Sequence, residues 1–454
     1  LNDTPFLSEK VTLQNLNKSY FVEGLIENKN TVLDEKIINN FINPLFKETN
    51  FRNLKLKAKN NFSFQINRKF KVDDFKLLSE IRLDELKFEH KLKLKNFFPN
   101  IKNEIILNDH LINVDYNKKI LSIKGRGNIL LQEMKDVVKY NINKIDNIFN
   151  FKSEVTIDKN PFHIDFLGYK KNLNNKAIID IKGEHKVSEK TTIESLSLSE
   201  KNNRFELNKL VFDNAFKIQN FKSINFDYFD QDMRENKIKI KKQKNIYNLT
   251  GSKFNANSLI ENLINDDNSN QLKIFNQNVD LNIKLNQVFL DKEYVITNLK
   301  GKLSFKKNEI SNAELIASFS KNKKFKFTVQ TNEQEKVTTL FLDQAEPIVS
   351  RYKFIKGYKG GSLDFYSSKK DKTYNSNLKI YDFKLKELPI LTKLLTLASL
   401  QGIADILSGE GITFDEFEMN FQTENNLITI NEMYAIGPAI SILMDGYVEK
   451  NKLI

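Results

Sequence analysis

Few residues in this chain combine the types and the spacing that chemistry requires. The four histidines (His90, His110, His163 and His185) are isolated, and none lies three or four positions from another, as two helical metal ligands would. The chain has no cysteine, which excludes disulfides and thiolate metal sites. It also lacks a nucleophile elbow, a phosphate-binding glycine loop and an HExxH motif. We therefore expect no metal, no cofactor and no enzymatic activity.

The acidic pairs are poor candidates for acid–base catalysis. Asp266 and Asp267 fall in an asparagine-rich stretch that is typical of a solvated loop. Asp415, Glu416 and Glu418 are close in sequence, but the two glutamates alternate with apolar residues, as the polar face of one strand would. Those apolar residues are Phe417, Met419 and Phe421.

Alternation of apolar and polar residues is the commonest pattern in the chain. The clearest run has apolar residues at every second position from Val279 to Leu285, and another extends from Leu299 to Phe305. Asn, Asp, Lys and Gly separate such runs at about ten-residue spacing, which is typical of hairpins. We expect a mostly β protein, built as a long antiparallel meander without βαβ units, in which each strand has one apolar and one polar face.

Helical patterns are few, and the strongest covers 389–408, which Pro389 opens and Gly409 ends. Its apolar residues cover more than half of the circumference, and its length of about 30 Å is close to a bilayer span. Lys393 and Asp405 argue against a membrane-spanning helix. Three interpretations stay open: a helix packed on or inside a sheet, a helix that lines a lipid groove, and a helix on a membrane surface. Shorter helices are expected at 34–48, 132–146 and 257–266.

The formal charge of +13 has two interpretations. Lysines are spread along strand patterns such as KLKLKN (91–96) and KIKIKKQK (237–244), and they do not gather on one arm or one helix. They indicate solvated strand faces in a chain whose richness in Lys, Asn, Ile and Phe is typical of an AT-rich genome. A basic surface for anionic headgroups or nucleic acid is the alternative. We expect the first interpretation and no nucleic-acid partner.

The chain of 454 residues is long enough for two or three domains or for one elongated, repetitive body. Its apolar content of 40% supports a sizeable core. Soft boundaries near 150 and 345 divide it into segments 1–150, 151–344 and 345–454. Because it begins at Leu1 without a methionine and ends inside a strand pattern, we expect a fragment of a longer protein.

The C-terminal segment resembles the AsmA-like family, in particular its YhdP-like branch and, more distantly, TamB-like proteins. The similar stretches are GGSLDF (360–365), YDFKLKELPILTKLL (381–395), LASLQGIADILSGEGI (397–412) and the strand pair that runs through Gly437 and Pro438 to Gly446. Further upstream, 247–264 and 278–310 resemble the strand, short helix and hairpins of the same family.

This resemblance implies an envelope protein of Gram-negative bacteria, anchored in the inner membrane by an N-terminal helix, with a periplasmic body. The implied sheet curls into a taco-like or tube-like groove that binds glycerophospholipids and conducts them between the inner and outer membranes. The alternative function is a non-enzymatic scaffold that assists outer-membrane protein assembly, as proposed for TamB-like relatives, with envelope proteins as partners.

The candidate groove residues are the apolar members of the clearest strands and of the apolar helix. Those on strands are Leu281, Ile283, Leu285, Leu303, Phe305, Phe417, Met419, Phe421, Ile428 and Ile430, and those on the helix are Leu394, Leu395 and Leu397. Period-two alternation places Lys284 on the opposite, polar face of its strand.

Overall fold

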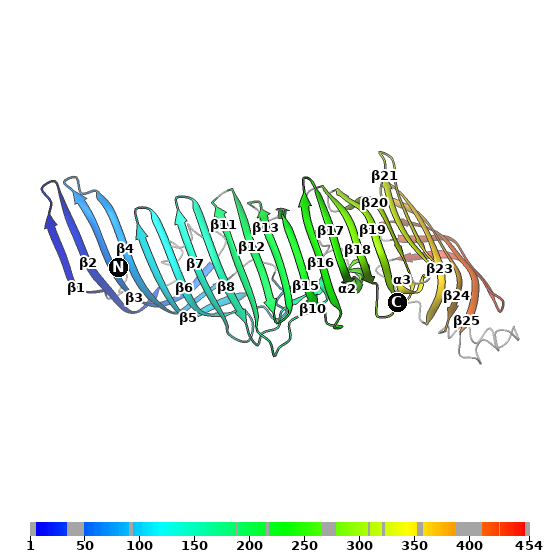
Figure 1. The fold of residues 1–454 in the computed structure, drawn as a ribbon, viewed down its shortest axis with the longest axis horizontal. Coiled ribbons are helices and arrows are strands. Elements are labelled where there is room, and N and C mark those ends of the chain that lie inside the picture. The colour runs from blue at the N-terminus through cyan, green and yellow to red at the C-terminus, as the bar shows by residue number, and fades with distance from the viewer. Residues whose placement is uncertain are drawn as a thin grey trace. The chain divides into compact units, whose positions relative to one another are not determined.

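A computed structural model describes most of the chain. The described residues are 6–33, 50–89, 94–187, 189–214, 218–265, 278–306, 309–319, 323–351, 357–386, 411–425 and 427–449. They belong to two compact units, Leu1–Met233 and Arg234–Ile454. Strands dominate both units (Figure 1), which confirms the expectation of a mostly β protein. The boundary near 150 that the sequence suggested falls within a strand, Ile148–Ile157.

The N-terminal unit contains one main antiparallel sheet. Its strands are β1 (Phe6–Asn15), β2 (Ser19–Leu33), β3 (Asn50–Asn67), β4 (Val72–Glu89), β5 (Glu104–Asn117), β6 (Ile120–Leu130), β7 (Asp136–Ile145), β8 (Ile148–Ile157), β11 (Ala177–Lys186), β12 (Lys190–Glu200), β13 (Asn203–Phe212), β14 (Ile218–Asn220) and β15 (Ser223–Phe229). Each strand from β1 to β7 pairs with the next one, β8 pairs with β11, and β13 pairs with both β14 and β15. Between β8 and β11 lies a small pair, β9 (His163–Ile164) and β10 (Tyr169–Lys170), joined by the 3₁₀ turn η1 (Asp165–Leu167).

The C-terminal unit also contains one main sheet. Its strands are β16 (Glu235–Gln243), β17 (Ile246–Asn255), β18 (Val279–Phe289), β19 (Val295–Lys306), β20 (Glu309–Ser318), β21 (Lys324–Thr331), β22 (Lys336–Leu342), β23 (Tyr358–Lys370), β24 (Thr373–Leu385), β25 (Ile412–Glu424), β26 (Leu427–Ile436) and β27 (Ser441–Glu449). Each strand pairs with the next in the chain.

One pair in this sheet is parallel, and here the expected meander without βαβ units is wrong. β17 and β18 run in the same direction, with Tyr247 beside Leu281 and Gly251 beside Leu285. A parallel pair requires a crossover connection instead of a hairpin turn. The helix α2 (Asn257–Asn265) begins that connection directly after β17.

The helices agree only partly with the sequence prediction. α2 confirms the short helix expected at 257–266. The helix expected at 132–146 is wrong, because most of that segment is β7. The apolar residues of this segment fit both the 3.6-residue period of a helix and the two-residue period of a strand. Pairing with β6 and β8 on either side stabilises the strand. A further short helix, α3 (Glu346–Val349), was not expected. The expected helices at 34–48 and 389–408 lie outside the described residues.

Short hairpin turns fix the register of neighbouring strands. The turn between β5 and β6 places Lys118 and Lys119 at positive φ, 48° and 73°, as a mirror-image turn between twisted strands requires. Because side chains alternate between the two faces, a slip of one residue would move every apolar side chain to the polar face. Register therefore decides which residues of distant strands share a surface.

Candidate functional site

In the C-terminal unit, directly paired residues line up across the sheet in rows of apolar side chains. Directly opposite residues in a sheet point to the same face. The first row has one member on every strand from β18 to β27. Its members are Ile283, Gly301, Leu315, Phe327, Leu340, Phe365, Leu378, Met419, Met433 and Met444.

A second row lies beside the first, one pleat repeat along the strands. Its members, from β20 to β27, are Ala317, Phe325, Leu342, Leu363, Ile380, Phe417, Ala435 and Ile442. These two rows, with the apolar residues that flank them on the same side, form what we term the C-terminal apolar face. At about 4.8 Å per strand, the first row extends about 45 Å.

All the groove candidates predicted on strands lie on this face. Leu281 pairs with Leu303, and Phe421 pairs with Ile430. Ile283 and Leu285 are 8% and 3% exposed, whereas the other strand candidates are half-buried. The same register also places Phe305 beside Val279, Phe417 beside Ala435, Met419 beside Met433, and Ile428 beside Thr423. The helix candidates Leu394, Leu395 and Leu397 lie outside the described residues.

The opposite face of this sheet is polar. Lys284 pairs directly with Lys300, and neither belongs to the apolar rows. Glu418 accepts hydrogen bonds from Tyr434 at 2.6 Å and from Asn377 at 2.6 Å, and it forms an ion pair with Lys379 at 2.9 Å. The hydrogen bond from Tyr434, helped by Lys379 and Asn377, lowers the pKa of Glu418 to about 2. As the sequence predicted, Glu416 and Glu418 belong to the polar face of their strand.

The N-terminal unit carries an apolar face of its own, and none of the groove candidates predicted from the sequence lies on it. One row comprises Ala58, Ile81, Ile112, Gly125, Tyr140, Ser153, Ile181, Leu196, Leu207 and Ile224. A second comprises Val11, Gly24, Phe62, Leu77, Tyr116, Leu121, Lys144, Phe149, His185, Thr191 and Phe212. The signal that could have found it is the alternation at Leu121 and Ile123 and at Leu196 and Leu198, but the candidates were taken from the clearest strand patterns, which lie in the C-terminal half.

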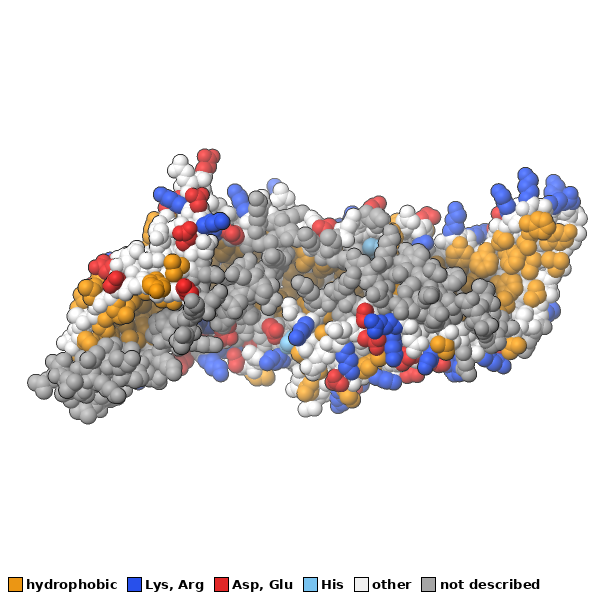
Figure 2. Space-filling model, turned by 180° about the vertical axis from the view of Figure 1, so that it is seen from behind, with side chains coloured by type: hydrophobic (Ala, Val, Ile, Leu, Met, Phe, Trp, Pro, Cys, Tyr) orange, Lys and Arg blue, Asp and Glu red, His pale blue; other side chains and the backbone are white. Residues whose placement is uncertain are grey.

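Some apolar side chains remain accessible to solvent on the apolar face of each unit. In the N-terminal unit they lie near the first strands, and in the C-terminal unit they lie near the last strands. Figure 2 shows hydrophobic side chains gathered over the first strands of the N-terminal unit, and again over the last strands of the C-terminal unit. Val11 and Leu13 on β1 are 56% and 66% exposed, and Met444 on β27 is 53% exposed. Rings on the N-terminal apolar face contact one another, with centroids 6.4 Å apart for Phe64 and Phe75 and 5.9 Å apart for Phe75 and Tyr116.

One histidine lies buried on the N-terminal apolar face. The imidazole of His110 contacts the carbonyl oxygen of Asn128 through Nε2 at 2.9 Å and the hydroxyl of Tyr140 through Nδ1 at 3.2 Å. A side chain at Gly127 would overlap the imidazole and approach the His110 Cα at 2.7 Å, so glycine makes room for the ring. Burial lowers the pKa of His110, although Asn128 and Asp109 act in the opposite direction. This arrangement holds a neutral, structural histidine.

A closed polar cluster lies where β12 ends, beside the β9–β10 insertion. Glu200 is 2% exposed and accepts hydrogen bonds from the Tyr169 hydroxyl at 2.7 Å and the Asn172 amide at 2.9 Å. The side chains of Asn175 and Asn203 donate to it at 2.9 and 3.1 Å. Burial opposes ionisation, but these hydrogen bonds outweigh it and hold the pKa of Glu200 below its usual range.

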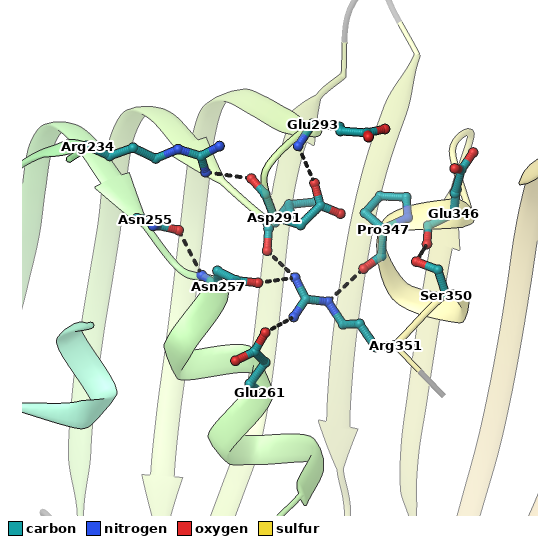
Figure 3. A network of polar contacts seen from close by, with 11 residues as sticks. Arg234, Asn255, Asn257, Glu261, Asp291, Glu293, Glu346, Pro347, Ser350 and Arg351 are labelled. Atoms are coloured by element: carbon teal, nitrogen blue, oxygen red, sulfur yellow. Dashed lines mark hydrogen bonds and ion pairs between the residues drawn. The ribbon is translucent and has the colours of Figure 1, made fainter. Parts of the chain in front are cut away.

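The C-terminal unit has a comparable cluster around Arg351, directly after α3 (Figure 3). Arg351 donates to the Pro347 carbonyl at 2.8 Å, to the Asn257 side chain at 2.8 Å and to the Leu290 carbonyl, and it lies 3.8 Å from Glu261. One guanidinium therefore joins α2, the turn after β18 and α3. Nearby, Arg234 donates to the carbonyl oxygens of Asp291 and Lys292 at 2.5 and 2.7 Å.

Neither cluster has the composition of a reactive centre, because each polar group already has protein partners. Within the described residues, no group of three or more His, Asp or Glu side chains is placed to hold a metal ion. In that same part of the chain, every helix is too short or too polar to cross a bilayer. The apolar faces are thus the most extensive candidate site.

Comparison of the chain with protein families, with curated proteins and with solved structures finds no match.

Proposed function

We propose that this chain is an AsmA-like envelope protein whose apolar faces bind glycerophospholipids and conduct them between the inner and outer membranes. The observation that carries the proposal is the first apolar row of the C-terminal unit, which continues without a charged residue from β18 to β27. Acyl chains would lie along such rows. The finer architecture that we propose is a sheet curled into a groove around them.

The energetics favour a path of this kind. An acyl chain that crosses water exposes its methylenes at about 0.8 kcal/mol each, so transfer of one ordinary chain costs on the order of 10 kcal/mol. Consecutive half-buried side chains on neighbouring strands would replace that water contact at every step. Such conduction needs no catalytic group, and it would place the body of the protein in the periplasm, with an inner-membrane anchor.

Site-specific photocrosslinking in cells tests this proposal, with the probe at Phe365 and a control probe at Tyr366. These neighbours are both aromatic, but Phe365 is half-buried in the first apolar row, whereas Tyr366 is 46% exposed on the opposite face. We expect a phospholipid adduct at Phe365 alone.

Adducts at neither position, in a protein that remains folded, would reject lipid binding at this face. That result would favour the scaffold function in outer-membrane protein assembly, which requires no retained lipid. Equal adducts at both positions would indicate nonspecific contact with membranes and would also contradict the proposal.

A further inference from the structure

Three hairpins are built alike, one in the N-terminal unit and two in the C-terminal unit, each at an edge of the apolar face of its own unit. In each, a lysine pairs directly across the turn with an aromatic residue five positions later: Lys144 with Phe149, Lys242 with Tyr247, and Lys369 with Tyr374. The ammonium groups lie 5.7, 5.4 and 5.0 Å from the respective ring centroids. The residue two positions after each lysine has a positive φ, at Asp146 (50°), Lys244 (55°) and Asp371 (52°).

Register places these lysines on the apolar side of their strands. Lys144 belongs to the row of Leu121 and Phe149, two residues beyond Ile142. Tyr247 pairs with Leu281 of the C-terminal apolar face, so Lys242 shares that side. All three lysines are half-buried, and the ammonium group of each lies over the face of its ring.

The third hairpin shows what an ammonium group in this position binds. Glu309 lies 4.0 Å from the Lys369 Nζ and 3.6 Å from the Lys336 Nζ, so a carboxylate of the chain already supplies the anion there. Within the described residues, neither Lys144 nor Lys242 has such an ion pair. Each carries an ammonium group beside an aromatic ring and an apolar surface, with hydrogen-bond donors left for an external anion.

At the other end of the strands, the described charged groups of the two polar clusters already have partners in the chain. In the N-terminal unit this end holds Glu200, whose oxygens are taken up by four donors. In the C-terminal unit it holds Arg351, whose guanidinium already binds Pro347, Leu290 and Asn257. Arg234 also lies over a ring there, 4.6 Å from the centroid of Phe289, but it donates to the carbonyl oxygens of Asp291 and Lys292. In Figure 1, β10 marks this end of the strands in the N-terminal unit, and α2 and α3 mark it in the C-terminal unit. The three lysine–aromatic hairpins lie at the opposite ends of their strands.

From this asymmetry we infer that Lys144 and Lys242 each bind the phosphate of an anionic glycerophospholipid whose acyl chains lie on the adjoining apolar face. The inference rests on the proposed function and adds an orientation to it, with headgroups at the hairpin edge. Phosphate offers the strong acceptor oxygens that a lysine ammonium group binds through charge-assisted hydrogen bonds. The two positions belong to different units, and each is a site by itself.

The test compares lipids retained by the purified full chain after incubation with vesicles of phosphatidylcholine and phosphatidylglycerol. We expect the double variant Lys144→Gln/Lys242→Gln to retain lipid, with a ratio of phosphatidylglycerol to phosphatidylcholine about five- to tenfold lower than the unmodified protein. The matched control is Lys152→Gln/Lys241→Gln, which removes the same charge from the polar side of neighbouring positions and should keep the ratio. Lys144→Arg/Lys242→Arg should keep it as well.

Two outcomes would overturn the inference: an unchanged ratio of phosphatidylglycerol to phosphatidylcholine in the double variant, or an equal fall of that ratio in the control. In either case, lipid retained by the protein would still support the proposed function. If the wild-type protein retained neither lipid, this result would instead contradict the proposed function. Glycerophosphoglycerol, the headgroup without acyl chains, should not displace the lipid at equal concentration. Effective displacement would assign the lysines to a free phosphate ester and would also overturn the inference.

Discussion

At the residue scale, His110 makes the stability of the N-terminal unit depend on pH. Burial lowers its pKa in the folded chain, whereas the unfolded chain titrates near the ordinary value of about 6.5. Between the two pKa values the unfolded chain binds more protons, so the stabilising contribution is fully present above about pH 6.5 and is lost as the pH falls toward the folded pKa. We expect the free energy of unfolding to decrease in that window, as measured by denaturant titration at several pH values.

The variant His110→Gln identifies the source of this dependence. It should flatten the pH profile relative to the wild type, because the titrating group is gone. His185→Gln is the control, since His185 is only half-buried and contacts the Thr191 hydroxyl at 2.9 Å. A profile that keeps its slope in His110→Gln would show that another group is responsible.

Glu200 is a second residue whose neighbours decide its energetics. Glu200→Gln would turn an amide NH₂ toward donors that now point at a carboxylate, leaving buried donors without an acceptor. We expect a loss of about 2 kcal/mol in the free energy of unfolding. Glu194→Gln, at an exposed position of the same strand, should change it by less than about 0.5 kcal/mol. Similar values for both variants would contradict the role assigned to Glu200.

At the element scale, strands were largely predictable and their partners were not. Alternation alone indicated the strand that runs from Val279 to Leu285, and the helical pattern at 257–266 indicated α2. The segment at 132–146 fits both a helix and a strand, and only its neighbours in the sheet decide between them. The parallel pairing of β17 with β18 left no local signal, because direction depends on a crossover and not on strand composition.

Arg351 tests whether one side chain holds several elements together. Lysine keeps the charge but loses the planar fork that reaches Pro347, Asn257 and Leu290 at once. We expect Arg351→Lys to speed amide hydrogen exchange in α2 by about tenfold, with little change in β25 and β26. Arg68→Lys, at an exposed turn of the N-terminal unit, is the control. Uniform acceleration throughout the C-terminal unit would show a global loss of stability instead.

At the scale of the whole molecule, the sequence could predict apolar residues but not the surfaces that they form. Each groove candidate came from one strand at a time, whereas the rows arise from the register of one strand against the next, which brings residues that are distant in the chain onto one surface. The N-terminal apolar face shows this limit, because its residues also alternate but were not selected. Charge follows the same geometry, since lysines such as Lys284 and Lys300 occupy the polar face that the alternation leaves.

A negative charge on an apolar row should therefore impair lipid binding more than the same charge on the polar face. Leu340 is half-buried in the first apolar row, and its neighbour Phe341 is 43% exposed on the opposite face of β22. In Leu340→Asp, a carboxylate would have to lose its hydration beside an acyl chain, at a cost of several kcal/mol. We expect several-fold less retained phospholipid by mass spectrometry than in Phe341→Asp, with both variants accumulating and keeping the β signal in circular dichroism. If Leu340→Asp fails to fold while Phe341→Asp folds, the row is a closed core. Equal lipid retention in two folded variants would show that lipid does not touch this face.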